Sequence, residues 1–283
     1  MANTRYVIFA LLLGAALLLP ALSRLCRAAD QKNAEVKSPS GIDHSAWDRL
    51  LKKHVDDNGL VNYAAWKNNE DDVEALDRYL KQFAAKADKP AEGKEKAASL
   101  VNAYNAIAIR TILGAYPVDS IHEVGKPFEA KQWIIGGEKV SLNDIEHGTL
   151  RPMLKYRAHS VLVCVARSCP PLQRFAYSAE AFDSQNDSAY TRWLGREDLN
   201  KFLPEKNKAE ISSIFKWFES DFETSKPVAK VLAEYGPRSA KELTSGGKKF
   251  NISYISYNWG LNDQGEHGRD YSKLDLAWDS IFR

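Results

Sequence analysis

Residues 96–114 constrain the fold of this 283-residue chain more than any other stretch. They are apolar on nearly every side at helical spacing, and a helix that is hydrophobic all round is buried. Such a helix needs other elements to cover it, so the chain must form a globular domain around it. The composition agrees: 44% of the residues are hydrophobic and 27% are charged, which excludes a collagen-like or wholly disordered chain. Tyr116-Pro117 is predicted to end the helix.

Other patterns predict the elements that cover this helix. Gly136-Gly137 between apolar pairs predicts a hairpin over residues 131–141, and a capping-box-like start at Ser141 predicts a short helix that Pro152 stops. Apolar runs predict a strand over residues 160–165, buried on both faces, and a late strand over 250–257. Helical periodicity predicts helices over residues 43–55, 69–84, 179–194, 212–222 and 226–235. We therefore expect a single compact α+β domain over residues 43–283, with helices packed on a small mixed sheet.

The first 29 residues are predicted to be a signal peptide. A short positive start precedes the uncharged run at residues 7–22, and small residues follow at Ala28 and Ala29. An uncleaved signal-anchor is the alternative, in which case this segment alone would contact a membrane. Polar residues 30–42 are predicted to be a flexible lead-in. The expected location is therefore periplasmic or secreted, where a disulfide between Cys164 and Cys169 is chemically allowed.

Charge and motifs exclude several classes of function. Apart from residues 1–28, which hold three arginines and no acid, the chain has 36 Lys and Arg against 37 Asp and Glu, so we expect no nucleic-acid partner. The sequence contains no phosphate-binding Gly-rich loop, no dinucleotide fingerprint, no G-x-S-x-G motif and no H-E-x-x-H pair. We expect no cofactor. The spacing of the His and Cys residues matches no paired zinc-ligand pattern, so no metal site is predicted either.

Polar residues on the central helix and after it are the first candidates for a site. Asn102 and Asn105 project from one face of the buried helix, either to brace a neighbouring loop or to position a ligand or catalytic group. Glu146 and His147 follow on the short helix opened by Ser141. At the α-helical angle, Glu146 lies at the edge of its apolar face and His147 nearly opposite.

Two cysteines near the predicted strand are the other candidates. Strand alternation puts His159 and Cys164 on opposite faces, which forbids a direct dyad and makes His147 the better base for Cys164. Arg167 is close to Cys164 in sequence and could lower the pKa of its thiol, but the sequence does not show where the Arg167 side chain points. Cys169 completes a C-x4-C pair, which lacks the C-x-x-C spacing of the usual redox loop.

Six segments together resemble the domain-of-unknown-function 547 family over roughly residues 45–262. They are VNAYN at 101–105, YPVDSI at 116–121, SLNDIEH at 141–147, the stretch from His159 through Cys164 to SCPPL at 168–172, IFKWF with Asp221-Phe222 at 214–222, and YNWGLN at 257–262. Asn258 departs from the acid usual there, and Leu100 stands where an aromatic residue usually precedes the first motif. The resemblance implies a compact α+β domain, often exported in bacteria, whose recurring polar positions match Asn102, Asn105, Glu146, His147, His159 and Cys164. It implies no assigned activity.

The leading hypothesis is a thiol-dependent hydrolase or acyl transferase of the cell envelope. Cys164 is the nucleophile, His147 the base, and Glu146 or Asn105 orients the imidazole or steadies an oxyanion. His159, Arg167, Cys169, Asn102 and Asn105 are candidate binding residues for a small-molecule or peptide-like ligand. The alternatives are a non-catalytic envelope domain that binds a ligand or protein, and a thiol–disulfide function of Cys164 and Cys169.

Overall fold

The computed structural model describes residues 35–247, 249–269 and 271. The predicted signal peptide and the apolar tail at 274–282 lie outside the described residues. Part of the predicted lead-in is described, and it packs on the domain: Val36 is buried and its N–H donates to Thr149 Oγ1 at 2.8 Å.

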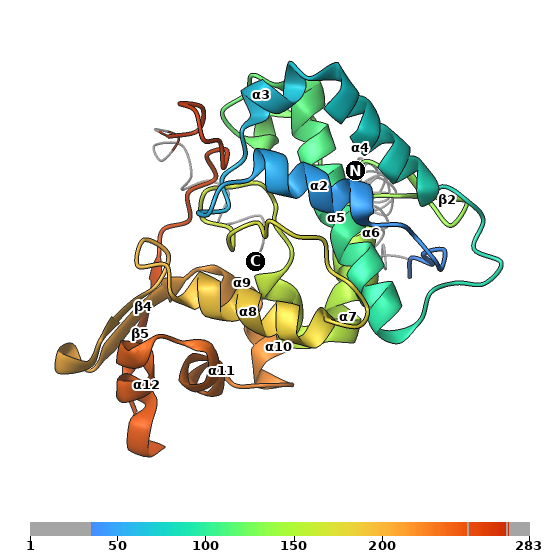
Figure 1. The fold of residues 1–283 in the computed structure, drawn as a ribbon. Helices are drawn as coiled ribbons and strands as arrows, with labels where there is room; N and C mark the ends of the chain where they lie inside the picture. Colours follow the sequence, from blue (N-terminus) through green and yellow to red (C-terminus); the bar gives the residue numbers. More distant parts are fainter. Residues whose placement is uncertain (1–34, 248, 270, 272–283) are drawn as a thin grey trace, which may run out of the picture. The chain divides into compact units, whose positions relative to one another are not determined.

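Helix α5 (Gly93–Ala115) is the centre of the fold and confirms the buried helix predicted at 96–114. Sixteen of its 23 residues are buried, which leaves no solvent-facing stripe in its middle. Helices α3 (Tyr63–Lys67), α4 (Glu70–Gln82), α6 (Leu142–Ile145) and α8 (Phe182–Leu194) all contact it, and Figure 1 shows it running between them. Tyr104 and Asn105 therefore lie deep in the domain.

Side-chain caps explain where the amino-terminal helices begin. The Asn62 side chain accepts from Ala65 N ahead of α3, and the Asn69 side chain accepts from Asp72 N ahead of α4. Helix α2 (Ser45–His54) packs on α4, where the Trp47 and Tyr79 rings stack 5.9 Å apart. These helices confirm the predictions over 43–55 and 69–84; α3 was not predicted.

Two small sheets complete an α+β fold, as predicted. Strands β1 (Trp133–Ile135) and β2 (Glu138–Val140) form the expected hairpin, whose turn residues Gly136 and Gly137 have φ values of +62° and +84° that favour glycine. The second sheet is mixed. Strand β4 (Lys208–Ser212) pairs antiparallel with β3 (Lys201–Leu203) and parallel with β5 (Asn251–Ile255), with Ala209 opposite both Phe202 and Ile252.

The remaining helices are short and lie along the carboxy-terminal half of the domain. They are α9 (Ile214–Trp217), α10 (Glu219–Glu223), α11 (Val228–Tyr235) and α12 (Arg238–Thr244). Helix α12 contacts β3 and β4, and α9 contacts β4, so the mixed sheet carries helices as expected (Figure 1). No helix among the described residues is long and apolar enough to span a bilayer.

Two local predictions are wrong. Residues 160–165 form no strand: a 3-10 turn at Lys155–Ser160 leads into an irregular buried loop. Pro152 does not stop the helix opened by Ser141. It lies in the first turn of α7 (Arg151–Leu154), where its missing N–H is tolerated, and the chain before it widens into a π turn at Glu146–Leu150.

Candidate active site

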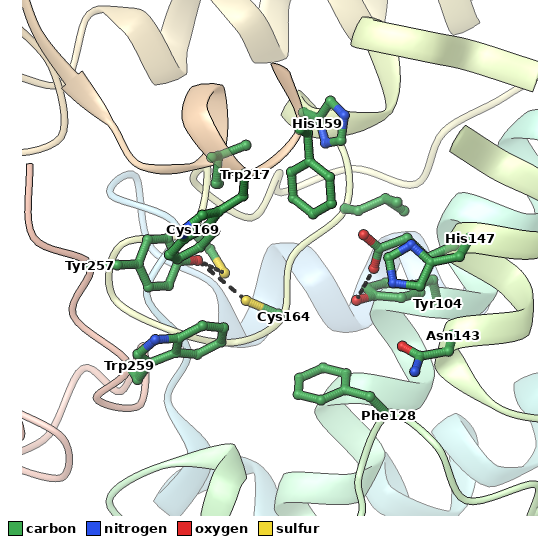
Figure 2. A pocket seen from close by; sticks show the side chains of 14 residues that line it. Tyr104, Phe128, Asn143, His147, His159, Cys164, Cys169, Trp217, Tyr257 and Trp259 are labelled. Atoms are coloured by element: carbon green, nitrogen blue, oxygen red, sulfur yellow. Dashed lines mark hydrogen bonds between the residues drawn. The ribbon is translucent and has the colours of Figure 1, made fainter. Parts of the chain in front are cut away.

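A partly open pocket with about 630 Å³ of empty space lies between α5, the π turn, the loop at 161–169 and the segment after β5. It brings together five of the predicted site residues: Glu146, His147, His159, Cys164 and Cys169. Figure 2 shows the cysteines with Tyr257 on one side, and His147 and Tyr104 on the other. The remaining lining residues are Phe128, Asn143, Leu162, Ile214, Trp217, Phe218 and Trp259.

The loop that carries Cys164 is held by backbone hydrogen bonds from two directions. The Asn105 side chain donates to Val161 O at 2.9 Å and accepts from Val163 N at 3.0 Å. On the far side of Cys164, Arg167 N donates to Gly260 O at 2.7 Å. Between these anchors Val165 has a φ of +60°, which is an outlier for a β-branched residue. The loop is thus a strained turn that presents Cys164 to the pocket.

Cys164 and Cys169 are both free thiols that share one hydrogen-bond partner. The Tyr257 hydroxyl lies 3.4 Å from Cys164 Sγ and 3.1 Å from Cys169 Sγ (Figure 2). Cys164 is partly exposed, whereas Cys169 is buried. The two cysteines therefore form one dithiol at the pocket wall, of which only Cys164 is partly exposed.

The environment shifts the two thiol pKa values in opposite directions. Hydrogen bonds from the Cys169 thiol, the Tyr257 hydroxyl and the Ala166 N–H lower the pKa of Cys164, against the opposing effects of burial and the Glu146 carboxylate. Burial and the neighbouring Cys164 raise the pKa of Cys169 well above its usual value. Cys164 is therefore the thiol that ionises first.

Across the pocket, the π turn places Glu146 and His147 at the same cavity. Tyr104 on α5 donates its hydroxyl to Glu146 Oε2 at 2.9 Å. The α-helical angle used for the sequence prediction put His147 nearly opposite the core face. The π turn changes that angle because its backbone bonds close five residues apart, from Arg151 N to Glu146 O.

His147 and His159 are linked through Arg151 and Asp221. Arg151 Nη1 lies 2.9 Å from His147 Nδ1, and Arg151 Nε donates to Asp221 Oδ2 at 2.7 Å. A guanidinium has no acceptor, so His147 Nδ1 accepts and the ring proton lies on Nε2. His159 Nε2 lies 2.8 Å from the same Asp221 oxygen.

This network sets the charge states of Asp221 and His159 at neutral pH. Burial would raise the pKa of Asp221, but hydrogen bonds from His159 and Arg151 hold it at about 2. Burial lowers the pKa of His159 despite the opposing effect of Asp221. His159 is thus a neutral ring that is stacked 4.4 Å from Phe218 and donates to Asp221. The prediction that His159 and Cys164 face opposite sides of a strand is wrong, because there is no strand and both line the pocket.

Three predicted site residues lie outside the pocket lining. Asn102 binds the backbone of Tyr177 through both ends of its amide, at 2.8 and 2.9 Å, and Asn105 binds the loop at 161–163. Both therefore brace loops. Arg167 turns away from the dithiol and donates to the carbonyls of Asp263 and His267. Asn258 caps the following turn through Gly260 N at 2.8 Å.

Sequence reasoning missed the partners of these residues. Tyr257 positions the thiols, Asp221 and Arg151 orient the histidines, and Tyr104, Phe128, Trp217 and Trp259 shape the walls. Tyr257 and Asp221 stand within the segments that carry the family resemblance, and that was the available signal. Within the described part of the chain, no three His, Cys, Asp or Glu side chains are grouped to hold a metal ion.

The fold and site define an α+β protein with a dithiol in an aromatic-walled pocket. The family described as "Protein of unknown function, DUF547" matches residues 89–194, which confirms the resemblance over that range. The match covers Glu146, His147, His159 and both cysteines of the pocket; Asp221 and Tyr257 follow it. The family has no assigned activity. Searches of curated proteins and of solved structures found no match.

Proposed function

We propose that this protein is a thiol–disulfide exchange enzyme in which Cys164 attacks and Cys169 resolves. One observation carries the proposal: two thiols at the pocket wall share the Tyr257 hydroxyl, and only the partly exposed one, Cys164, has a lowered pKa. An exposed, easily ionised cysteine beside a buried one is the arrangement that exchange needs, since the first thiolate attacks and the second thiol must reach the mixed disulfide.

The exchange balances without any further group. The Cys164 thiolate attacks one sulfur of a substrate disulfide RS–SR′, the S–S electron pair leaves with R′S⁻, and that thiolate takes up a proton. The Cys169 thiol loses its proton and attacks Cys164 Sγ, which releases RS⁻ for protonation. The substrate gains two electrons and becomes two thiols, while the protein gains one disulfide. A low-molecular-weight dithiol reverses the oxidation by the same two steps.

Tyr257 and Ala166 suit both steps. Hydrogen bonds from the Tyr257 hydroxyl and the Ala166 N–H lower the pKa of Cys164 and also act to lower that of Cys169. Once Cys164 is bound in a mixed disulfide, its negative charge is gone, and the same two donors are free to stabilise the Cys169 thiolate. No movement of the donors is required, because Tyr257 already lies within hydrogen-bond distance of both sulfurs.

Acyl transfer or hydrolysis at Cys164 is the second candidate. It is supported by Glu146 and His147, which line the same pocket as the thiol. It has less support than exchange because no hydrogen bond joins Cys164 to a histidine among the described residues, and His147 Nδ1 already accepts from Arg151. In this reaction Cys164 would form a thioester and Cys169 would be dispensable.

The decisive experiment separates the two reactions by the fate of Cys164. Reduced protein is treated with hydroxyethyl disulfide and analysed by mass spectrometry without reductant. We expect a Cys164–Cys169 bond in the parent chain, a trapped mixed disulfide on Cys164 in Cys169→Ser, and no reaction in Cys164→Ser. A Cys169→Ser variant that turns over fully, or a parent chain inert to the disulfide but acylated by an activated ester, would rule out exchange.

We also propose that this chemistry takes place outside the cytoplasm. Support comes from the uncharged run at residues 7–22 that follows Arg5 and precedes Ala28 and Ala29. A dithiol enzyme of that compartment works among disulfide-bonded substrates.

A further inference from the structure

We infer that the pocket in front of Cys164 selects organic cations, so that the preferred substrate is a small disulfide carrying an ammonium group. The inference rests on the proposed function for the disulfide and on the pocket walls for the cation. The two parts are separable by experiment.

The walls of the pocket are largely aromatic. Trp217 and Trp259 lie 5.9 Å apart with nearly parallel rings, and Tyr257 lies 4.8 and 4.7 Å from them. Phe128, Phe218 and Tyr104 line the rest of the cavity. The faces of aromatic rings attract cations, most strongly when water is excluded, and Trp is the best of them. Arg151 already uses one such face, with its guanidinium carbon 4.5 Å from the Phe218 centroid.

The charge of the lining is negative. Among the described residues no Lys or Arg lines this pocket, and Glu146 is its carboxylate. The Tyr104 hydroxyl donates to Oε2 of that carboxylate at 2.9 Å, which orients the group, and no hydrogen bond from a described residue reaches Oε1. The field of Glu146 also acts on the far side of the pocket, because it opposes the lowering of the pKa values of Cys164 and His159.

A cation in the pocket would remove one of the costs of attack. The Glu146 carboxylate opposes ionisation of Cys164. A bound ammonium group neutralises that carboxylate and thereby favours the thiolate that attacks the substrate. Binding and activation of the nucleophile are coupled in this way for a cationic disulfide and not for a neutral or anionic one.

A series of disulfides of matched size tests the inference. Rates of Cys164 modification are compared for cystamine, hydroxyethyl disulfide and dithiodiglycolate, which are cationic, neutral and anionic. We expect the cationic compound to react about tenfold faster than the neutral one, equivalent to about 1.4 kcal/mol of charge interaction, and the anionic one to react slowest. Because the three disulfides also differ in the acidity of their leaving thiols, each rate is divided by the rate of the same disulfide with N-acetylcysteine. Glu146→Gln should abolish the order of these relative rates, while Glu180→Gln, an exposed acid outside the pocket, should keep it.

The ratio of rates is the informative quantity. Loss of the Glu146 charge also favours the Cys164 thiolate, and that effect changes all three rates alike, so the ratio cancels it. Equal relative rates for the three compounds, or an order of relative rates that survives Glu146→Gln, would overturn the inference and leave disulfide exchange standing.

A binding measurement decides the cation question even if no disulfide reacts. Cys164→Ser protein is titrated with choline and with its neutral isostere, in which carbon replaces nitrogen, and followed by tryptophan fluorescence and calorimetry. We expect choline to bind about tenfold more tightly than the isostere and to lose that advantage in Cys164→Ser/Glu146→Gln. Equal affinity, or no binding of choline, would refute cation selection whatever the fate of the exchange reaction.

Discussion

Replacing Tyr257 by Phe should raise the pKa of Cys164 without disturbing the fold. The Tyr257 ring packs against both Trp217 and Trp259, with centroids 4.8 and 4.7 Å away, and Phe preserves this packing. Only the hydroxyl is lost, which lies 3.4 Å from Cys164 Sγ. A hydrogen bond to a charged group contributes about 1.5 kcal/mol at the low end of its range. One pKa unit corresponds to about 1.4 kcal/mol, so we expect a rise of about one unit.

Alkylation measures this directly. Iodoacetamide modifies the thiolate, so the pH at which the rate reaches half its maximum reports the pKa of Cys164. Below that pH the parent chain should react faster than Tyr257→Phe by about tenfold, and at high pH the two rates should converge. Cys169→Ala, which removes the donor with the largest effect on Cys164, should move the midpoint upward at least as far.

Tyr177→Phe is the matched control. Tyr177 is also buried, but its hydroxyl has no hydrogen-bond partner among the residues that the structure describes, and it does not line the pocket. Its loss should leave the midpoint unchanged. If Tyr257→Phe and Cys169→Ala both leave the midpoint where it is in the parent chain, the thiolate is not stabilised by these donors and our account of the dithiol is wrong.

Three further predictions concern the rest of the chain. Asn105→Leu should lower the free energy of unfolding by about 2–3 kcal/mol in urea titrations, because two backbone groups of the loop at 161–163 lose their partner. Asp221→Asn should remove about 2 kcal/mol at pH 7; since the pKa of Asp221 is lowered from 3.8 to about 2, the parent chain should lose this stability as the pH falls through that window, and the variant should not. Protein recovered from its producing cell should begin near Ala29 or Asp30 by amino-terminal sequencing, whereas a protein found in the cytoplasm and starting at Met1 or Ala2 would contradict export.

Elements with strong local signals could be predicted from the sequence. Helix α5 was predicted because apolar residues surround it, the β1–β2 hairpin because of Gly136-Gly137, and the start of α6 because Ser141 and Asp144 form a capping box. In each case the sequence signal lies within one short stretch of the chain. Strands β3 and β4 were missed, since β3 is only three residues long and β4 runs directly into α9.

The directions of Glu146 and His147 could not be predicted from the α-helical angle per residue, because the chain forms a π turn there. The sequence contains one reason for the π turn: in a regular α-helix the ring of Pro152 would clash with the carbonyl four residues earlier. The response to that clash depends on the surroundings, here on Tyr104 and Arg151, which hold Glu146 and His147 in their new directions. Sequence alone therefore placed both residues in one short helix but not in one pocket.

The prediction of a strand over residues 160–165 was wrong for a different reason. An apolar run of strand length can be buried without a sheet only if its backbone polar groups are satisfied elsewhere. Asn105 satisfies Val161 O and Val163 N from a helix 56 and 58 residues away, and Val165 O accepts from Asn262 N. Bracing a loop and positioning a catalytic group were the alternative roles for Asn105. Its amide makes the backbone hydrogen bonds that a neighbouring strand would otherwise make, and it thereby holds the loop that carries Cys164. The stability of the loop and the position of the thiol therefore depend on the same side chain.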